Sequence, residues 1–202
     1  MKKLPVEFYE REDVVQIAKE LLGKIVVTVF DNKITSGRIV EAEAYVARVD
    51  KASHAYAGRR TARNEHMYAK GATAYVYICY GMHHMLNVVT NKKDVPDAVL
   101  IRAIEPIEGI DIMLKRTGKG KFDNTLTKGP GNVGKALGVF KKHSGKLLLG
   151  DEIFIVAGRS APAESEIGIS KRIGVESAGA DGLLPYRFYI KGNKFVSGRP
   201  NK

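Results

Sequence analysis

Hydrophobic residues recur at helical spacing near the start of the chain and at strand-like spacing soon afterwards. Over residues 11–22, apolar side chains repeat every three or four positions, and Gly23 follows them, which predicts a helix. β-Branched residues over 24–30 and a returning apolar segment over 34–45 predict two strands, joined by a turn at Asp31–Lys33. We expect these two strands to form an antiparallel hairpin.

Five more strands and two more helices are predicted after an ordered loop over residues 50–72. The strands are expected over 73–80, 85–90, 98–104, 151–157 and 186–196, the last with a turn at Gly192–Asn193, and the helices over 106–116 and 132–138. Pro106 suits the first turn of a helix. This order predicts the α+β class, with one compact mixed domain over residues 1–202, a mainly antiparallel sheet and surrounding helices.

Charge and cysteine content narrow the functional classes. The chain has 33 Lys+Arg and 22 Asp+Glu, a net charge of +11, and nearly all of the surplus lies in residues 51–150. Such a surplus favours an acidic partner. Charge alone, however, does not distinguish a protein that binds nucleic acid from a basic protein that has no acidic partner. The single cysteine, Cys79, excludes a disulfide framework and a cysteine-rich zinc module.

The apolar segments are too short for a membrane protein. No apolar run approaches about 18 residues, and no apolar signal region follows Met1. We therefore expect a cytoplasmic protein without membrane association.

Two carboxylates lie two positions apart on the predicted strand 34–45. Strand alternation assigns its side chains to two faces: Ile39, Glu41, Glu43 and Tyr45 on one, and Val40, Ala42 and Ala44 on the other. Exposed strand faces often carry glutamate, so a solvated edge is one interpretation and a catalytic carboxylate is the other.

Three tyrosines, Tyr75, Tyr77 and Tyr80, lie within six residues of the predicted strand 73–80. They are consistent with the edge of a core, and equally with aromatic surfaces on which nucleobases stack. The preceding loop offers groups suited to phosphate contacts: Arg59, Arg60, Thr61, Arg63 and Asn64. A further candidate phosphate contact is Lys128 with Gly129, just before the predicted helix 132–138, although this segment also suits a plain helix start.

A series of short motifs in fixed order carries a family resemblance. The motifs are Glu43-Ala44-Tyr45, Ala52-Ser53-His54, Arg60-Thr61-Ala62-Arg63-Asn64, Ala74-Tyr75-Val76-Tyr77-Ile78-Cys79-Tyr80-Gly81-Met82, Leu100-Ile101-Arg102-Ala103-Ile104-Glu105-Pro106, Gly129-Pro130 and Arg187-Phe188-Tyr189. Together they resemble the alkyladenine (3-methyladenine or methylpurine) DNA glycosylase family, over about residues 5–197. The resemblance implies an antiparallel sheet with a protruding hairpin, and a reaction that uses no metal, no cofactor and no covalent enzyme–DNA link.

The resemblance also implies a role for individual residues. Glu43 would activate the attacking water and Arg102 would help to position it, whereas Glu41 is given no catalytic role. Four side chains would form the pocket for the flipped base: Tyr45, His54 and Tyr77, which hold it, and Asn87, which screens against guanine. Tyr80 would enter the minor groove and fill the space left by the extruded nucleotide, with Thr61 and Met82 touching the DNA near the lesion.

These roles predict a monofunctional enzyme that removes alkylated or deaminated purines from double-stranded DNA. The expected substrates are 3-methyladenine, 7-methylguanine, hypoxanthine and ethenoadenine, the product is an abasic site for base-excision repair, and the protein is expected to be a monomer. A base must leave the duplex before it can be reached, which a damaged base does at lower cost. The alternatives are a non-catalytic nucleic-acid-binding module and, less favoured because metal ligands are missing, a nuclease or base deaminase.

Overall fold

The computed structural model describes residues 2–198, so Met1 and residues 199–202 of the predicted domain lie outside the described part. Its strands are β1 (Ile25–Phe30), β2 (Lys33–Tyr45), β3 (Thr73–Cys79), β4 (His83–Thr90), β5 (Asp97–Glu108), β6 (Ile153–Val156), β7 (Ile167–Ser170) and β8 (Arg187–Ile190). Its α-helices are α1 (Val6–Tyr9), α2 (Val14–Glu20), α3 (Ile110–Thr117) and α4 (Pro130–Leu137). Six short 3-10 helices lie in the connections: η1 (Tyr56–Gly58), η2 (Glu65–Tyr68), η3 (Asn124–Leu126), η4 (Lys141–His143), η5 (Glu164–Glu166) and η6 (Glu176–Leu183).

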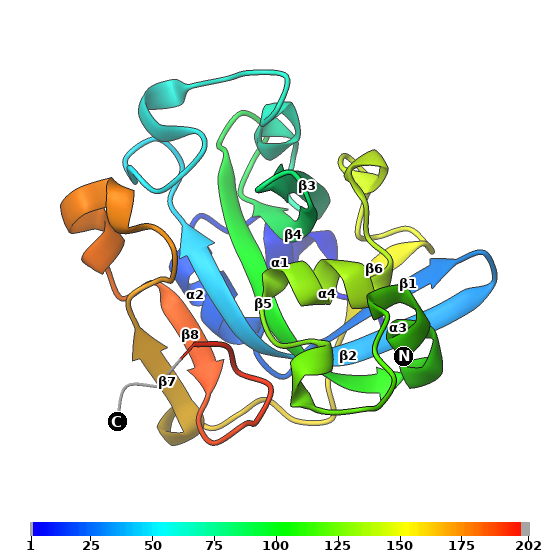
Figure 1. The fold of residues 1–202 in the computed structure, drawn as a ribbon. Coiled ribbons are helices and arrows are strands. Elements are labelled where there is room, and N and C mark those ends of the chain that lie inside the picture. The colour runs from blue at the N-terminus through cyan, green and yellow to red at the C-terminus, as the bar shows by residue number, and fades with distance from the viewer. Residues whose placement is uncertain (1, 199–202) are drawn as a thin grey trace.

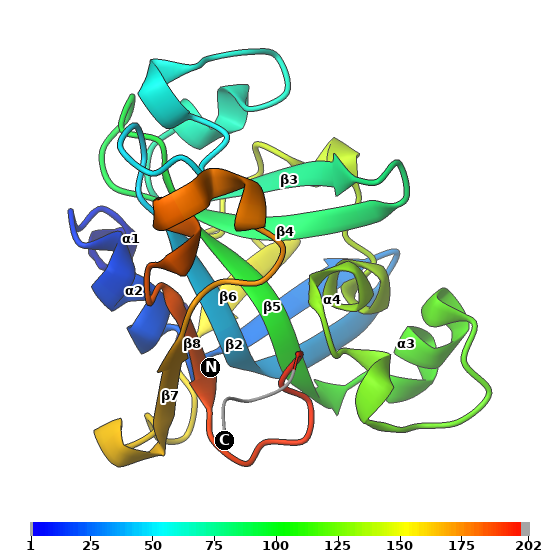
Figure 2. The same cartoon turned by 60° about the vertical axis from the view of Figure 1, so that its left-hand side comes forward.

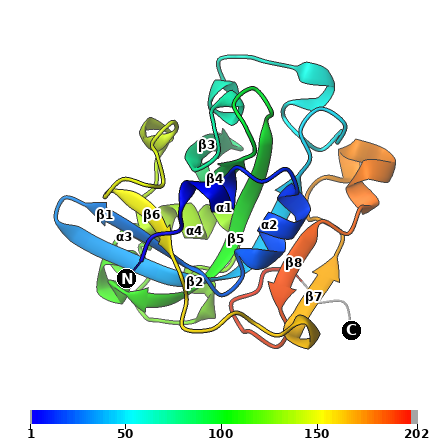
Figure 3. The same ribbon diagram turned by 180° about the vertical axis from the view of Figure 1, so that it is seen from behind.

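The strands form one antiparallel sheet in the order β3-β4-β5-β2-β1-β6, and β8, which carries β7, joins it at β2. The predicted α+β class with a mainly antiparallel sheet is therefore confirmed. The sheet branches because β2 is long: its first half pairs with β1, and its second half pairs with β8. The helix α2 lies behind the sheet in Figure 1 and in front of it in Figure 3.

Two hairpins have turns that their sequences explain. Asp31 and Asn32 between β1 and β2 both have positive φ, as a two-residue hairpin turn requires. The hairpin β3–β4 turns through Tyr80, Gly81 and Met82, with Cys79 opposite His83. Figure 2 shows β3–β4 extending away from the rest of the sheet, as the family resemblance implied.

The helix expected from residue 106 begins later, at Ile110. Pro106 is instead part of β5, where it lies opposite Gly37 of β2. The ladder between β4 and β5 has already ended at Leu100, so β4 does not pair with Pro106. The β5 strand therefore continues past the predicted end, and the chain turns at Gly109, whose φ is +73°. A Cβ on Gly109 would lie 2.2 Å from the Ile34 carbonyl oxygen, so this turn needs glycine.

Elements near the two ends of the chain also differ from the prediction. The strand expected over 186–196 is only the four-residue β8, because the chain turns away after Ile190. The short elements α1 and β7 were not predicted, since four residues are too few to show a clear hydrophobic period.

The faces of β2 also differ from simple alternation. Ile39 packs in the main core with Ala42 and Ala44, whereas Val40 belongs to a separate cluster with Phe195. The register between β2 and β5 shifts around Glu41, and such a bulge moves neighbouring side chains to the opposite face. Past the bulge, Glu43 accepts hydrogen bonds from residues that line the cavity described below.

Candidate active site

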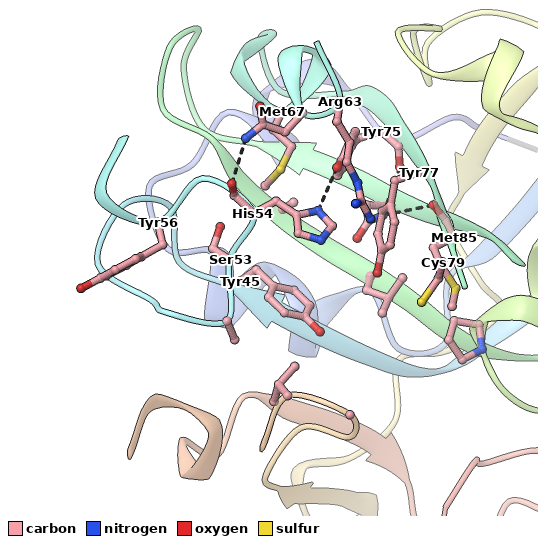
Figure 4. Close-up of a pocket in the computed structure, with 18 of the residues that line it drawn as sticks. Tyr45, Ser53, His54, Tyr56, Arg63, Met67, Tyr75, Tyr77, Cys79 and Met85 are labelled. Atoms are coloured by element: carbon pink, nitrogen blue, oxygen red, sulfur yellow. Dashed lines mark hydrogen bonds between the residues drawn. The ribbon is translucent and has the colours of Figure 1, made fainter. Parts of the chain in front are cut away.

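A cavity of about 560 Å³ lies between β2, the hairpin β3–β4, β5, the loop 51–64 and the segment 173–177. It gathers eight of the residues predicted for the site from sequence: Tyr45, His54, Thr61, Arg63, Tyr77, Tyr80, Asn87 and Arg102. Figure 4 shows the rings of Tyr45, His54 and Tyr77 gathered at the cavity, with His54 above Tyr45 and to the left of Tyr77 in this view. Segments as far apart in the chain as Tyr45 and Ser177 thus contribute to one aromatic pocket.

The Glu43 carboxylate is fully buried and is held by three residues that line the cavity. Its Oε2 accepts hydrogen bonds from the Tyr45 hydroxyl at 2.9 Å and from Arg102 Nη1 at 3.2 Å. Its Oε1 accepts one from the Ile173 backbone N–H at 2.8 Å. Burial raises the pKa of Glu43 above its usual value, while these three donors act in the opposite direction. The carboxylate is fixed in orientation and is a stronger base than an exposed glutamate.

Arg102 is held by the second carboxylate of the strand. Its Nε donates to Glu41 Oε1 at 2.9 Å, and Arg187 Nε donates to the same oxygen at 2.7 Å. Ser197 donates to both oxygens of Glu41, from its backbone N–H at 2.6 Å and its hydroxyl at 2.9 Å. Glu41 and Glu43 are each 0% exposed. The solvated-edge interpretation is therefore wrong, and Glu41 is a structural partner of Arg102.

The aromatic wall consists of His54, Tyr75 and Tyr77. The Tyr75 and Tyr77 rings stack with centroids 5.6 Å apart, and the His54 ring meets Tyr77 edge-on at 4.6 Å. His54 Nδ1 is 2.9 Å from the Tyr75 hydroxyl, which fixes the imidazole orientation. Tyr75 also lines the cavity but is only 1% exposed, so of the three tyrosines predicted as stacking surfaces it serves mainly as a support for His54.

The titratable groups of this wall are neutral near pH 7. Burial, with help from the cations of Arg63 and Arg59, lowers the pKa of His54 to about 4. Burial raises the pKa of Tyr77 to about 12. The wall therefore presents neutral aromatic rings, on which both neutral and cationic planar groups can stack.

Two asparagines orient the wall from behind. Asn87 donates its side-chain N–H groups to the carbonyls of Tyr75 and Met85, at 3.1 and 3.2 Å. Asn64 donates to the His54 carbonyl at 2.9 Å and accepts from the Thr61 backbone N–H at 2.7 Å. The predicted pocket residue Asn87 is thus held in a fixed orientation. Asn64 links the loop that carries Arg59, Arg60 and Arg63 to His54 of the pocket.

The tip of the β3–β4 hairpin projects two large apolar side chains into solvent. Tyr80 is 86% exposed and Met82 70% exposed. Tyr80 has φ of +49°, an unusual backbone angle for tyrosine. The Arg63 guanidinium lies 5.6 Å from the Tyr77 ring centroid and donates to the Ile78 carbonyl, so a cation stands beside this hairpin.

Other predicted DNA contacts lie outside the cavity lining. Arg60 forms ion pairs with Glu65 of η2 and with Asp94 of the connection between β4 and β5. Gly129 caps the start of α4, and the next residue, Pro130, lines the cavity. Lys128 pairs with Ala103 in an isolated bridge.

Several residues of the site carried no sequence signal of their own. Ile173 contributes only its backbone N–H, which any residue but proline could supply. Arg172 and Ser197 are likewise buried and contact the site from the last third of the chain. Arg187 does so as well, and its motif with Phe188 and Tyr189 is part of the family resemblance, which implies no role for it. Their placement depends on the pairing of β8 with β2, which local patterning does not reveal.

Within residues 2–198, no three His, Cys, Asp or Glu side chains are grouped so as to hold a metal ion. Within the same residues, no helix has both the length and the apolar character needed to cross a membrane.

Comparison with known proteins agrees with this geometry. The family model described as methylpurine-DNA glycosylase matches residues 7–194. Three bacterial proteins, each named "Putative 3-methyladenine DNA glycosylase", are similar over nearly the whole chain. The one from Clostridium novyi (strain NT) is 47% identical, covering 98% of this chain and 99% of its own. The one from Clostridium acetobutylicum is 44% identical, covering 96% and 97%. The one from Chlamydia abortus is 44% identical, covering 93% and 97%.

A model match over most of the chain and relatives of this similarity lead to one conclusion. This chain belongs to the methylpurine-DNA glycosylase family, whose members are DNA-binding hydrolases of DNA repair.

Proposed function

We propose that the protein removes alkylated or deaminated purines from double-stranded DNA by monofunctional hydrolysis of the N-glycosidic bond. The observation that carries the proposal is the Glu43 carboxylate, buried at the wall of an aromatic cavity and held by Tyr45, Arg102 and the Ile173 N–H. The proposed substrates are 3-methyladenine, 7-methylguanine, hypoxanthine and ethenoadenine, and the product is an abasic site.

The flipped base would stack in the cavity between Tyr45 on one side and His54 with Tyr77 on the other. A neutral His54 supports this role for cationic alkylpurines, because an imidazolium would repel them. Asn87 lies at the same cavity, where its position is suited to crowding the exocyclic amino group of guanine. Selection would therefore combine the lower cost of extruding a damaged base with the shape of the pocket.

Cleavage would begin at the sugar carbon that carries the base. The base leaves with the electron pair of the broken C–N bond: a cationic alkylpurine departs as a neutral base, and a neutral lesion must take up a proton on the purine as it departs. The oxocarbenium-like sugar left behind would be stabilised by the Glu43 carboxylate, which would accept a proton from the attacking water. The raised pKa of Glu43 supports this role, since a general base works best with a pKa near the working pH. Arg102 would keep the carboxylate oriented and would help to place the water.

The hairpin tip and the positive charge would hold the DNA. The exposed Tyr80 side chain is the proposed wedge, which would occupy the gap left by the flipped nucleotide. Thr61 and Met82 are proposed to touch the DNA near the lesion. Arg63, Lys128 and Gly129 are the proposed contacts to the DNA phosphates, and Arg60 is proposed to contribute positive charge at the loop. We further propose that the protein acts as a monomer in the bacterial cytoplasm, on nucleoid DNA.

The decisive experiment is base release from a duplex with a single hypoxanthine or 3-methyladenine, measured in the presence of EDTA. We expect strand cleavage only after hot alkali, which reports abasic sites, and no borohydride-trapped enzyme–DNA product. Cleavage without alkali would contradict the monofunctional mechanism.

Glu43→Gln tests the role of the carboxylate. We expect the variant to bind lesion DNA and to release base at least about 10²-fold more slowly, the usual contribution of a general base. The matched control is Glu105→Gln, which changes a half-exposed glutamate of β5 that pairs with Arg38. Full activity of Glu43→Gln would rule out Glu43 as the base.

A further inference from the structure

Arg172 is a fully buried arginine that joins three segments around the cavity. Its side chain forms an ion pair with Asp50, from the loop after β2, in which Nη2 donates to Asp50 Oδ1 at 2.8 Å. It also donates to the Ala44 carbonyl of β2 at 2.9 Å and to the Asp181 carbonyl of η6 at 2.9 Å. Figure 2 shows η6, in orange, near the cyan loop that follows β2.

The residue that follows Arg172 touches Glu43. Ile173 supplies the N–H that binds Glu43 Oε1, and the segment around it lines the cavity. This segment lies between β7 and η6 and has no strand partner along residues 171–175 in the described structure. Arg172 supplies the side-chain contacts that join this segment to Ala44 of β2 and to Asp50.

The same guanidinium also lies beside a second of the three donors to Glu43. It lies 4.7 Å from the ring centroid of Tyr45, whose hydroxyl binds Glu43 Oε2. Asp50 is itself fixed by its own loop, because its Oδ1 accepts from the Ala52 N–H at 2.9 Å. A rigid pair of charges thus supports both the amide and the ring that orient the carboxylate.

We propose that Asp50 and Arg172 are positioning residues, which orient the Glu43 carboxylate by fixing the Ile173 N–H and the Tyr45 ring. The inference rests on the proposed function, because it assigns these residues to the reaction of Glu43. Neither side chain needs to touch the base or the sugar. The pair would act on the rate of base release and leave the affinity for lesion DNA nearly unchanged.

Arg172→Lys is the main test, because lysine keeps the charge but cannot replace the planar, multiply bonded guanidinium. We expect its single-turnover rate of base release to fall about 10- to 100-fold, the scale of small misplacements at a reacting centre. Its Kd for lesion DNA should change less than about threefold. Asp50→Asn should show a smaller loss, since an amide can keep the hydrogen bond to Ala52.

Two readouts separate positioning from a general loss of structure. The Ile173 hydrogen bond lowers the pKa of Glu43, so its loss should move the acid limb of the rate profile to higher pH. Hydrogen exchange should become faster in residues 171–177 and stay unchanged in β5. The matched control is Arg38→Gln, which breaks a half-exposed ion pair with Glu105 near the first half of β2 and should leave rate and pH profile unchanged.

Wild-type activity separates this inference from the proposed function. If the wild-type protein releases no base, the proposed function fails first. If it is active and Arg172→Lys keeps the wild-type rate and acid limb, the positioning role is wrong. A variant that loses only DNA affinity, or failure of both variants to fold, would also overturn the inference, because the pair would then serve binding or folding alone.

Discussion

The Tyr45 hydroxyl donates a hydrogen bond to Glu43 Oε2, with 2.9 Å between the two oxygens. The two residues are two positions apart on β2, so strand geometry alone directs both side chains to one face. A ring proposed to hold the base and a carboxylate proposed to activate water are therefore directly coupled. A movement of the ring on base binding would therefore change the hydrogen bond to the carboxylate.

Tyr45→Phe keeps the ring and removes this donor. The hydroxyl lowers the pKa of Glu43, so its loss should raise that pKa and move the acid limb of base release to higher pH. The measurement is the single-turnover rate against pH with a hypoxanthine duplex. Tyr77→Phe is the matched control, and its acid limb should stay with the wild type. Coincident profiles for Tyr45→Phe and the wild type would contradict the coupling.

The pH profile of the wild-type enzyme should reflect Glu43 and not His54. Only the ionised carboxylate accepts a proton, so activity should be lost as pH falls through the raised pKa of Glu43, above the ordinary 4.5. His54, with a pKa of about 4, stays neutral above pH 5 and should add no limb near 6.5. A single-turnover profile of His54→Gln with the same acid limb as the wild type would support this assignment; a shifted limb would oppose it.

Glu41→Gln should be costly although Glu41 has no proposed chemical role. Its carboxylate lies between Arg102 and Arg187, and removing the charge leaves two buried cations with one fewer partner. We expect a loss of about 3–5 kcal/mol in the free energy of unfolding, the usual effect of breaking a buried ion pair. Urea denaturation measures it, with Glu105→Gln as a control expected to lose less than about 1 kcal/mol. Equal losses in the two variants would contradict the network.

Tyr80→Ala should weaken lesion-DNA binding without changing stability. The side chain is almost fully exposed, so its removal costs the folded protein little, whereas a stacked aromatic is worth about 1–3 kcal/mol in binding. We expect about a tenfold rise in Kd for lesion DNA, measured by fluorescence anisotropy. Leu183→Ala, exposed and outside the cavity lining, is the control. Tyr75→Ala should act mainly on stability, and an equal effect of both tyrosines on Kd would count against the wedge.

Asp97→Asn tests a buried carboxyl away from the proposed chemistry. Burial raises the pKa of Asp97 to about 6, and its Oδ1 has no hydrogen-bond partner in the described residues. Protonation of Asp97 therefore stabilises the folded state. Its contribution to the free energy of unfolding is complete below pH 3.8 and is lost as pH rises through about 6. The asparagine variant should be more stable than the wild type above pH 7, by up to about 3 kcal/mol, and nearly equal to it at pH 4. Thermal unfolding at both pH values gives the comparison, and a destabilised variant at pH 8 would contradict the prediction.

Much of the fold could be predicted because the strands carry strong local patterns. The helix over 11–22 and the strands β1, β2, β3 and β4 lie within a few residues of their predicted positions. The exception at Pro106 has a physical cause. The β4–β5 ladder ends at Leu100, so Pro106 pairs with β2 on one edge only, and proline tolerates such an edge position. Gly109 then allows the sharp turn that ends β5. Short elements such as β7 form because they pair with other strands, and four residues carry too little pattern to predict such a pairing.

The sequence by itself determined the antiparallel α+β fold, the two carboxylates on one strand face, the tyrosine-rich hairpin and the family resemblance. Tertiary structure alone decided that Glu41 binds Arg102, that the Ile173 N–H donates a hydrogen bond to Glu43, and that Arg172 pairs with Asp50. The reason is that these contacts join residues 61 to 130 positions apart. Periodicity reports which face a side chain takes within its own element, whereas a hydrogen bond between distant segments depends on how the whole sheet pairs and bends.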